Sequence, residues 1–308
     1  MIMSSYRIGI IGVGNMGSRI AKRLLDAGEE IVGYDRDEAH QDAAGIPFAS
    51  SPGSLVSDVD VVLLSLPDSP VIESVVLGEE GLVSHSHSGQ IVVDLSTASP
   101  ESSVRIHDEF AAHGVEFLDA GISGGAKAAE AGKLTLMVGG SAEALEKVRS
   151  VLDHFSSNVF HMGSTGSGHV AKLLNNFLNG VSLAATAEVM VAARKFGLNL
   201  ATFLDVLNNS SGVNFATLNR FPSIIRGDYL EGGLTGQLMA KDLKLYLDFI
   251  ARLGVPSFNG PACLATFEVV NALGYGEEIS NRVVDGLGDL AGGIRLQNGE
   301  ATSEEAGS

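Results

Sequence analysis

The sequence predicts two domains, a doubly wound α/β domain followed by an all-α domain. Three observations lead to this prediction. Over the first half of the chain, apolar strand-like runs alternate with helix-like segments, an order typical of a parallel sheet covered by helices. Glycines interrupt the chain where the first apolar run passes into the first helix. From residue 169 onward, apolar residues recur at helical spacing without a convincing strand among them.

Seven apolar runs in the first half are predicted to be strands. Several of them are continuous rather than alternating with polar residues, which is typical of strands buried on both faces of a mainly parallel sheet. The predicted strands cover residues 6–12, 30–35, 60–67, 90–96, 115–120, 134–140 and 158–163.

Helical segments lie between these strands, and the clearest are residues 16–28 and 99–114. In the second of them Ser99 precedes Pro100, which predicts a serine N-cap with proline at the first helical position. Residues 169–196 contain no proline and a single glycine, so we expect one long helix there. Three further helical runs complete the second half, at residues 234–254, 259–274 and 279–293.

The chain of 308 residues is long enough for about two domains. A Gly/Ser-rich connector at residues 163–168 separates the two patterns. We therefore predict an α/β domain over residues 1–164 and an all-helical domain over residues 165–296. The polar and acidic residues 297–308 are predicted to be a frayed tail.

The composition favours a globular protein of the cytoplasm. Hydrophobic residues make up 45% of the chain and charged residues 19%. The N-terminus lacks the features of a secretory signal, and no apolar segment approaches the roughly 20 residues that span a bilayer. Cys263 is the single cysteine and is expected to pack on a buried helix face. The net charge of −17 opposes binding to nucleic acid.

The glycine-rich turn has the spacing of a Rossmann-like dinucleotide site. Gly12, Gly14 and Gly17 permit a tight turn, a close approach of the backbone to a pyrophosphate, and close packing of helix on strand. The next predicted strand ends at Asp35, close to the usual offset of the acidic residue that binds a ribose 2′-hydroxyl. Asp35 therefore favours NAD, whereas Arg36 beside it leaves NADP open.

With this turn, five stretches in order along nearly the whole chain resemble the β-hydroxyacid dehydrogenase family. This family includes 3-hydroxyisobutyrate dehydrogenases and tartronate semialdehyde reductases. The stretches are GIIGVGNMGSRIAKRL, DLSTASP, DAGISGG, GSGHVAKLLNN and the KDL of residues 241–243.

Two residues of the long helix are the candidate catalytic pair. Lys172 and Asn176 are four residues apart, so both side chains project from one face of the helix. A desolvated lysine has a lowered pKa and exchanges a proton with the substrate oxygen while hydride moves to or from the nicotinamide. Asn176 is expected to orient that oxygen or the ammonium group. Family members, unlike imine reductases, usually keep this lysine.

The substrate is expected at the end of the fifth strand. Ser123, Gly124 and Gly125 offer backbone N–H groups and a hydroxyl to a carboxylate. Ser96 and Thr97 follow the apolar run QIVVDL and are expected at a similar sheet edge, with Ser96 binding substrate. The resemblance implies that Thr97 lies against both cofactor and substrate. It also implies that the cofactor contacts Gly12, Gly14, Asn15, Met16, Gly17, Asp35, Arg36, Leu66, Pro67, Thr97 and Lys241.

Some positions depart from the family pattern. Gly121 stands where the family usually has proline, and His169 also points toward 6-phosphogluconate dehydrogenases. Those enzymes are longer and show a His-Asn-Gly run where this chain has Asn-Asn-Phe at residues 175–177. Lys127, two residues past Gly125, is a candidate for binding an anionic group at the distal end of the substrate.

These patterns predict an NAD-dependent enzyme that interconverts a small anionic 3-hydroxy acid and its semialdehyde. One alternative is a dehydrogenase of 6-phosphogluconate type or of another doubly anionic hydroxy acid. An alternative of another class is a non-catalytic regulator that binds NAD(H). His85 and His87 in a Ser/Gly loop are interpreted as surface residues, so no metal is expected. The resemblance and the apolar helical half predict a homodimer or homotetramer.

Overall fold

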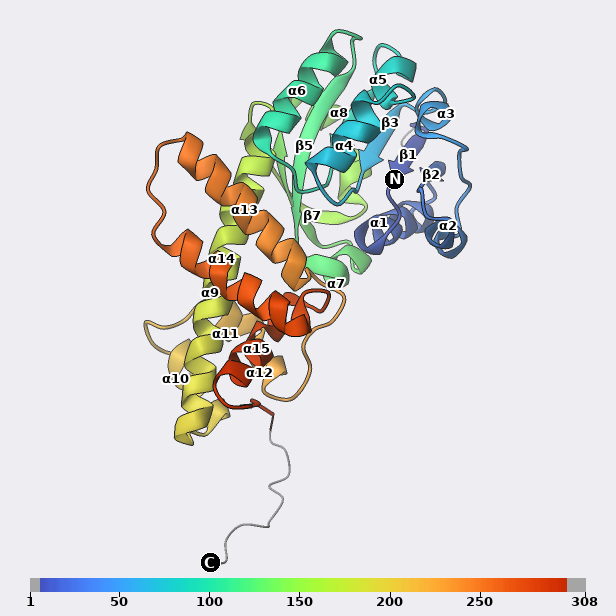
Figure 1. The fold of residues 1–308 in the computed structure, drawn as a ribbon. Coiled ribbons are helices and arrows are strands. Elements are labelled where there is room, and N and C mark those ends of the chain that lie inside the picture. The colour runs from blue at the N-terminus through green and yellow to red at the C-terminus, as the bar shows by residue number, and fades with distance from the viewer. Residues whose placement is uncertain (1–5, 298–308) are drawn as a thin grey trace, which may run out of the picture. The chain divides into compact units, whose positions relative to one another are not determined.

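The computed structural model describes residues 6–297, and the chain divides into two compact units (Figure 1). The sheet unit extends through Leu174, and the helical unit begins at Asn175. Helix α9 (Ser167–Phe196) runs through this division. The domain boundary predicted after residue 164 remains a prediction. Of the predicted frayed tail, residues 298–308 lie outside the described residues.

A seven-stranded sheet forms the centre of the sheet unit. Its strand order is β2-β1-β3-β4-β5-β6-β7. The first five strands are parallel, β6 is antiparallel to β5, and β7 is parallel to β6. All seven predicted strands are confirmed. They are β1 (Ile8–Ile11), β2 (Ile31–Tyr34), β3 (Val61–Leu64), β4 (Ile91–Asp94), β5 (Glu116–Ser123), β6 (Leu134–Gly139) and β7 (Ser156–Gly163).

Helices cover both faces of this sheet, because successive side chains of a strand point to opposite faces. Ile10 of β1 packs in one core with Leu24 of α1, whereas the neighbouring Ile11 packs in another core with Phe110 of α6. The doubly wound fold class is therefore confirmed. The helices of this unit before α9 are α1 (Asn15–Asp26), α2 (Glu38–Ala44), α3 (Pro52–Val56), α4 (Ser69–Leu77), α5 (Leu82–His85), α6 (Pro100–Ala111), α7 (Gly125–Glu130) and α8 (Ala142–Asp153).

Local sequence signals set the helix starts. The Ser99 hydroxyl accepts the backbone N–H of Ser102, with Pro100 at the first position of α6, as predicted. The long helix predicted over residues 169–196 is α9, which begins two residues earlier, at Ser167.

The helical unit contains a second core. Met190 of α9 packs there with Phe221, Met239 and Phe267 from later helices. Cys263 is buried in the same core, as expected, and burial raises the pKa of its thiol to about 11. The elements after α9 are α10 (Leu200–Asn208), α11 (Phe215–Asn219), α12 (Phe221–Ile224), α13 (Gly236–Arg252), α14 (Asn259–Val270), the π-helix η1 (Asn271–Tyr275), the 3₁₀ helix η2 (Ser280–Arg282) and α15 (Val283–Leu290).

The all-α prediction for this half is confirmed within the described part of the chain. Its extended pairing consists of one isolated bridge between Thr235 and Ile279. Across residues 6–297, no helix is both long enough and apolar enough to pass through a bilayer.

Candidate active site

The carboxyl ends of β1 to β5 lie along one edge of the sheet, because these five strands are parallel. The chain leaves β1 for β2 on one side and returns to β3 on the other, so the order reverses between β1 and β3. Ligands of doubly wound sheets bind at such a point. The predicted residues that end a strand or follow one at this edge are Gly12, Gly14, Asp35, Leu66, Pro67, Ser96, Thr97, Ser123 and Gly124.

The three glycines of the first turn serve different purposes. Gly12 has a φ of +89°, and a Cβ there would lie 2.3 Å from the Ser65 carbonyl oxygen. A Cβ on Gly17 would lie 1.9 Å from the carbonyl oxygen of Gly12. A Cβ on Gly14 would make no such close contact, since its nearest neighbour would be His40 Cε1 at 3.7 Å. Packing therefore explains the first and third glycines, whereas the second leaves the start of α1 open.

This open helix start fits the pyrophosphate of a dinucleotide. No side chain caps α1, and its first turn carries no acidic residue. An anion there is stabilised by the N–H groups and the dipole of the helix N-terminus. Asn15 is exposed and Met16 is partly buried beside this start.

Asp35 is held rigidly at the end of β2. Its Oδ2 accepts the backbone N–H of Val13 at 2.8 Å, and its Oδ1 accepts that of Asp37 at 2.9 Å. Arg36 is exposed, and His40 Nδ1 lies 3.5 Å from Asp35 Oδ2. The fixed carboxylate is suited to accept ribose hydroxyl groups. Sequence reasoning missed His40, because it lies on α2 and belongs to no motif.

Ser96 joins two neighbouring turns. Its buried hydroxyl accepts the backbone N–H of Leu66 at 2.9 Å, and its own N–H donates to Asp94 Oδ1 at 3.0 Å. The turns after β3 and β4 are thus tied together, with Pro67 exposed and Thr97 partly buried next to them. The predicted contact of Ser96 with substrate remains a prediction.

The glycine pair after β5 adopts backbone that other residues rarely accept. Gly124 has a φ of +128° and Gly125 a φ of +70°. A Cβ on Gly125 would meet nothing within 4 Å, and no side chain caps α7. Open, uncapped backbone of this kind suits a carboxylate. Ser123 is partly buried before the pair, and Lys127 is exposed on α7.

The first turn of α9 is anchored on the sheet. A Cβ on Gly168 would lie 2.3 Å from the carbonyl oxygen of Asp119, so only glycine permits this approach. The Asp119 carboxylate accepts the N–H groups of Gly166 and His169 at 2.7 and 2.8 Å. Burial raises the pKa of this carboxyl group. Lys172 lies on the next turn of α9 and is partly buried.

Gly121 lies directly against the stem of Lys172. A Cβ at position 121 would come within 2.4 Å of Lys172 Cβ. The departure from the family's proline therefore falls at the candidate catalytic lysine. No sequence signal indicated this contact, since the two residues lie far apart in the chain.

His169 braces the same region from inside. It is fully buried, and its Nδ1 lies 2.7 Å from Ser103 Oγ of α6. Its Nε2 lies 4.0 Å from Asp94 Oδ2, and within residues 6–297 neither atom has a hydrogen-bond partner. His169, near the start of α9, thus lies beside the end of β4 and contacts α6.

In the helical unit, Asp242 holds Asn176. The Asn176 Nδ2 donates to Asp242 Oδ2 at 2.5 Å, and both residues are buried. Lys241 Nζ lies 3.2 Å from the other carboxylate oxygen. Asn176 Oδ1 accepts from Asn175 Nδ2 at 3.4 Å, and because an amide oxygen has two lone pairs it can accept from a second donor. The KDL motif contained Asp242, but sequence reasoning gave it no role.

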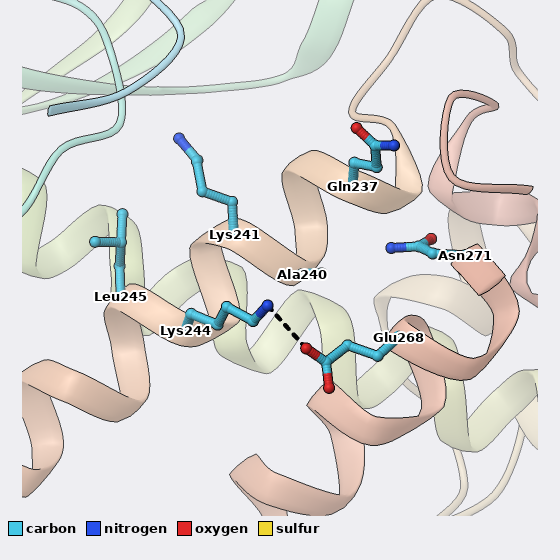
Figure 2. A pocket seen from close by; sticks show the side chains of 7 residues that line it. All are labelled: Gln237, Ala240, Lys241, Lys244, Leu245, Glu268 and Asn271. Carbon is cyan, nitrogen blue, oxygen red and sulfur yellow. Dashed lines mark ion pairs between the residues drawn. The ribbon is translucent and has the colours of Figure 1, made fainter. Parts of the chain in front are cut away.

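Lys241 also lines a cavity of about 600 Å³ on α13 and α14 (Figure 2). Lys244 and Glu268 form an ion pair at 2.8 Å across one wall. Figure 2 shows the Lys241 ammonium pointing away from this pair. The cavity is lined by Gln237, Ala240, Lys241, Lys244, Leu245, Glu268 and Asn271.

The histidine loop has contacts of its own. His85 Nδ1 lies 3.0 Å from the Gly81 carbonyl oxygen, and its Nε2 lies 3.6 Å from Glu80. In the described part of the chain, no group of three or more His, Cys, Asp or Glu residues is arranged to hold a metal ion.

Comparison with known proteins places this geometry in a family. A profile of the NAD binding domain of 6-phosphogluconate dehydrogenase matches residues 7–163. A profile described as NAD-binding of NADP-dependent 3-hydroxyisobutyrate dehydrogenase matches residues 166–285. The two matches meet at the start of α9.

Individual relatives agree with the profiles. A 2-(hydroxymethyl)glutarate dehydrogenase of Eubacterium barkeri is 34% identical over 283 residues, covering 91% of this chain and 94% of that protein. An NAD-dependent L-serine dehydrogenase of Pseudomonas aeruginosa is 37% identical over 281 residues, with coverages of 88% and 94%.

A solved structure supports the same assignment. The 3-hydroxyisobutyrate dehydrogenase of Mycobacterium tuberculosis, solved with L-serine, aligns with a TM-score of 0.82 and 28% identity over 93% of this chain and 99% of that chain. NAD is therefore supported as cofactor, with NADP possible. The chain belongs to the β-hydroxyacid dehydrogenase family and is an NAD(P)-dependent oxidoreductase of hydroxy acids.

Proposed function

We propose that this enzyme interconverts a small 3-hydroxy acid and its semialdehyde, with Lys172 as general acid and base. The observation that most supports this role is the anchored start of α9, where Asp119 and Gly168 fix the turn that directly precedes Lys172. Proton transfer requires the donor and acceptor within hydrogen-bond reach, so a fixed lysine stem favours it. The relatives named for 2-(hydroxymethyl)glutarate and L-serine support the substrate class.

When bound, the nicotinamide ring accepts hydride in oxidation and supplies it in reduction. In oxidation, the neutral Lys172 amine takes the proton of the substrate hydroxyl group. In reduction, the Lys172 ammonium returns a proton to the oxygen. Asn176, whose Nδ2 donates one hydrogen to Asp242, orients the ammonium through Oδ1 or the substrate oxygen through its second Nδ2 hydrogen. The pair thus moves and orients one proton.

The substrate carboxylate is assigned to Ser123, Gly124 and Gly125. The open, uncapped backbone of the glycine pair supports this assignment. Lys127 is exposed on the following helix and is kept as a candidate for a distal anion.

The dinucleotide is assigned to the turn of Gly12, Gly14 and Gly17 and to Asp35. Two backbone N–H groups hold the Asp35 carboxylate at the end of β2, and this charge opposes a 2′-phosphate. NAD is therefore the preferred cofactor in this proposal.

The decisive experiment follows nicotinamide absorbance at 340 nm with a panel of 3-hydroxy acids and semialdehydes, each with both cofactors. We expect turnover of at least one hydroxy acid and its semialdehyde. Tight NADH binding without turnover of any compound would contradict the proposal and favour the non-catalytic regulator. These relatives are all named as dehydrogenases, and their names support a catalytic function over a regulatory one.

A homodimer or homotetramer formed through the helical unit is also proposed. Fourteen large apolar residues of this unit are exposed in the described chain, against five in the sheet unit. The larger number of exposed apolar side chains on the helical unit supports this proposal, because large apolar patches commonly mark interfaces. Light scattering coupled to gel filtration tests this proposal, and cell fractionation tests the predicted cytoplasmic location.

A further inference from the structure

Arg220 of the helical unit is a partly buried cation, and in the described part of the chain it has no carboxylate partner. It lies between α11 and α12. Its Nη1 donates to Asn281 Oδ1 at 2.6 Å, and its Nη2 donates to Asn179 Oδ1 at 2.8 Å. Within residues 6–297, no Asp or Glu forms an ion pair with this guanidinium group.

Another arginine of the same unit shows what a structural arginine receives here. Arg295 pairs with Asp289 at 2.6 Å, and this hydrogen bond raises the pKa of Arg295. Burial without such a partner lowers the pKa of Arg220 to about 10. The two amide oxygens that hold Arg220 supply orientation but no negative charge.

The guanidinium group has donors left for a ligand. Of its five N–H groups, Asn179 and Asn281 take two. A fixed guanidinium fork matches the two oxygens of a carboxylate. The exposed ring of Phe215, whose centroid lies 5.8 Å from Arg220 Cζ, adds an apolar wall. The surroundings of Arg220 therefore lack one negative charge and suit a planar anion.

The position of Asn179 connects this cation to the proposed reaction. Asn179 follows Asn176 by three residues on α9, so both amides project from one face of the helix. The rise between them is roughly 4.5 Å. The amide that holds Arg220 is thus less than one turn from the amide assigned to the reacting oxygen.

We propose that Arg220, held by Asn179 and Asn281, binds a second carboxylate of the substrate, so that the enzyme acts on a dicarboxylic 3-hydroxy acid. This inference rests on the proposed function and specifies its substrate class. The chain carries a net charge of −17, which repels a dianion. A local cation is therefore needed to admit one.

The test uses substrates that differ mainly in the distal group. 3-Hydroxyisobutyrate carries a methyl group where 2-(hydroxymethyl)glutarate carries a carboxyethyl group, and the distal amide of the latter keeps its length without the charge. The unmodified enzyme is expected to prefer the diacid over both other compounds by at least about tenfold in kcat/KM. Equal use of the diacid and its distal amide would overturn the inference.

Variants then assign the preference to Arg220. Arg220→Gln is expected to lower kcat/KM for the diacid by about 10- to 100-fold, mainly through KM, and to leave 3-hydroxyisobutyrate within about threefold. Arg220→Lys keeps the positive charge but not the planar guanidinium group, so kcat/KM for the diacid is expected to fall less than in Arg220→Gln. The matched control is Arg226→Gln, an exposed arginine nearby that removes the same charge. This control variant is expected to leave kcat/KM unchanged for both substrates.

Two outcomes separate a failure of this inference from a failure of the proposed function. Equal losses on both substrates, with a lowered melting temperature, would make Arg220 a structural brace. Turnover of no hydroxy acid would instead contradict the proposed function.

Calorimetric titration of glutarate into the NADH complex measures binding without requiring activity. Glutarate binding should weaken at least tenfold in Arg220→Gln. Unchanged glutarate binding would overturn the inference even if the variant is active. If Arg220→Gln fails to fold, the diacid and amide comparison on the unmodified enzyme decides.

Discussion

The two units carry their candidate functional groups in different ways. In the sheet unit the groups are mainly backbone turns at one sheet edge, made possible by glycines such as Gly12, Gly17 and Gly124. In the helical unit they are side chains joined across long sequence separations. Asn176 and Asp242 lie 66 residues apart, and Arg220 and Asn281 lie 61 apart. The first kind of site is determined by short local sequence motifs, whereas the second depends on how the helices pack.

Removing the candidate proton carrier should produce the largest effect. Lys172→Ala is expected to lower kcat by about 10²- to 10⁴-fold, since general acid–base groups contribute on this scale. NADH affinity should stay within about twofold, because this lysine is assigned to substrate. Stopped-flow rates and fluorescence titration of NADH measure the two quantities. Lys195→Ala on the same helix, an exposed lysine, is the control and should leave both unchanged. A loss of kcat below about tenfold would refute the assignment.

The glycines of the first turn should separate folding from cofactor binding. Gly17→Ala brings a Cβ within 1.9 Å of the Gly12 carbonyl oxygen, so the free energy of unfolding should fall by about 1–3 kcal/mol or more. Gly14→Ala meets no atom closer than 3.7 Å and should leave the melting temperature nearly unchanged. It should weaken NADH binding about 10- to 100-fold by crowding the phosphates. Equal melting temperatures for both variants would contradict the assignment of Gly17 to folding and of Gly14 to cofactor binding.

The fold and the glycine turn of the candidate site were predictable from sequence for a physical reason. Strands buried on both faces are continuous apolar runs, and the glycine turn has a fixed spacing, so seven strands and the turn could be located. The contact of Gly121 with Lys172 and the brace at His169 were not predictable. They depend on how α9 meets β5 and β4, and no local pattern encodes that meeting.

A variant of Asp242 should test whether packing positions the chemistry in the helical unit. Asp242→Asn removes the charged acceptor for Asn176 Nδ2 and the ion pair with Lys241. We expect kcat to fall about tenfold and the free energy of unfolding to fall by about 1–3 kcal/mol. Asp248→Asn on the exposed side of α13 is the control. Full activity in Asp242→Asn would show that Asn176 needs no fixed orientation.

Cofactor choice should respond to a single residue of the sheet unit. The unmodified enzyme is expected to have a higher kcat/KM with NADH than with NADPH, because the Asp35 carboxylate repels a 2′-phosphate. Asp35→Ser should narrow this ratio severalfold. The ratio is the proper measure, since Asp35 also holds the N–H groups of Val13 and Asp37 and its loss affects both cofactors. Equal use of NADPH by the unmodified enzyme would assign the dominant influence to Arg36.

The smallest effect is expected at Lys127. A variant of this residue tests which unit binds the distal anion of the substrate. Lys127 is exposed on the short helix α7, and exposed ion pairs contribute little to binding. Lys127→Met should therefore lower kcat/KM for the diacid by about threefold or less, and its effect should multiply with that of Arg220→Gln. A selective loss larger than that of Arg220→Gln would place the distal anion in the sheet unit. The carboxylate-binding loop would then extend from Ser123 through Lys127, and the side chains of the helical unit would serve packing rather than recognition.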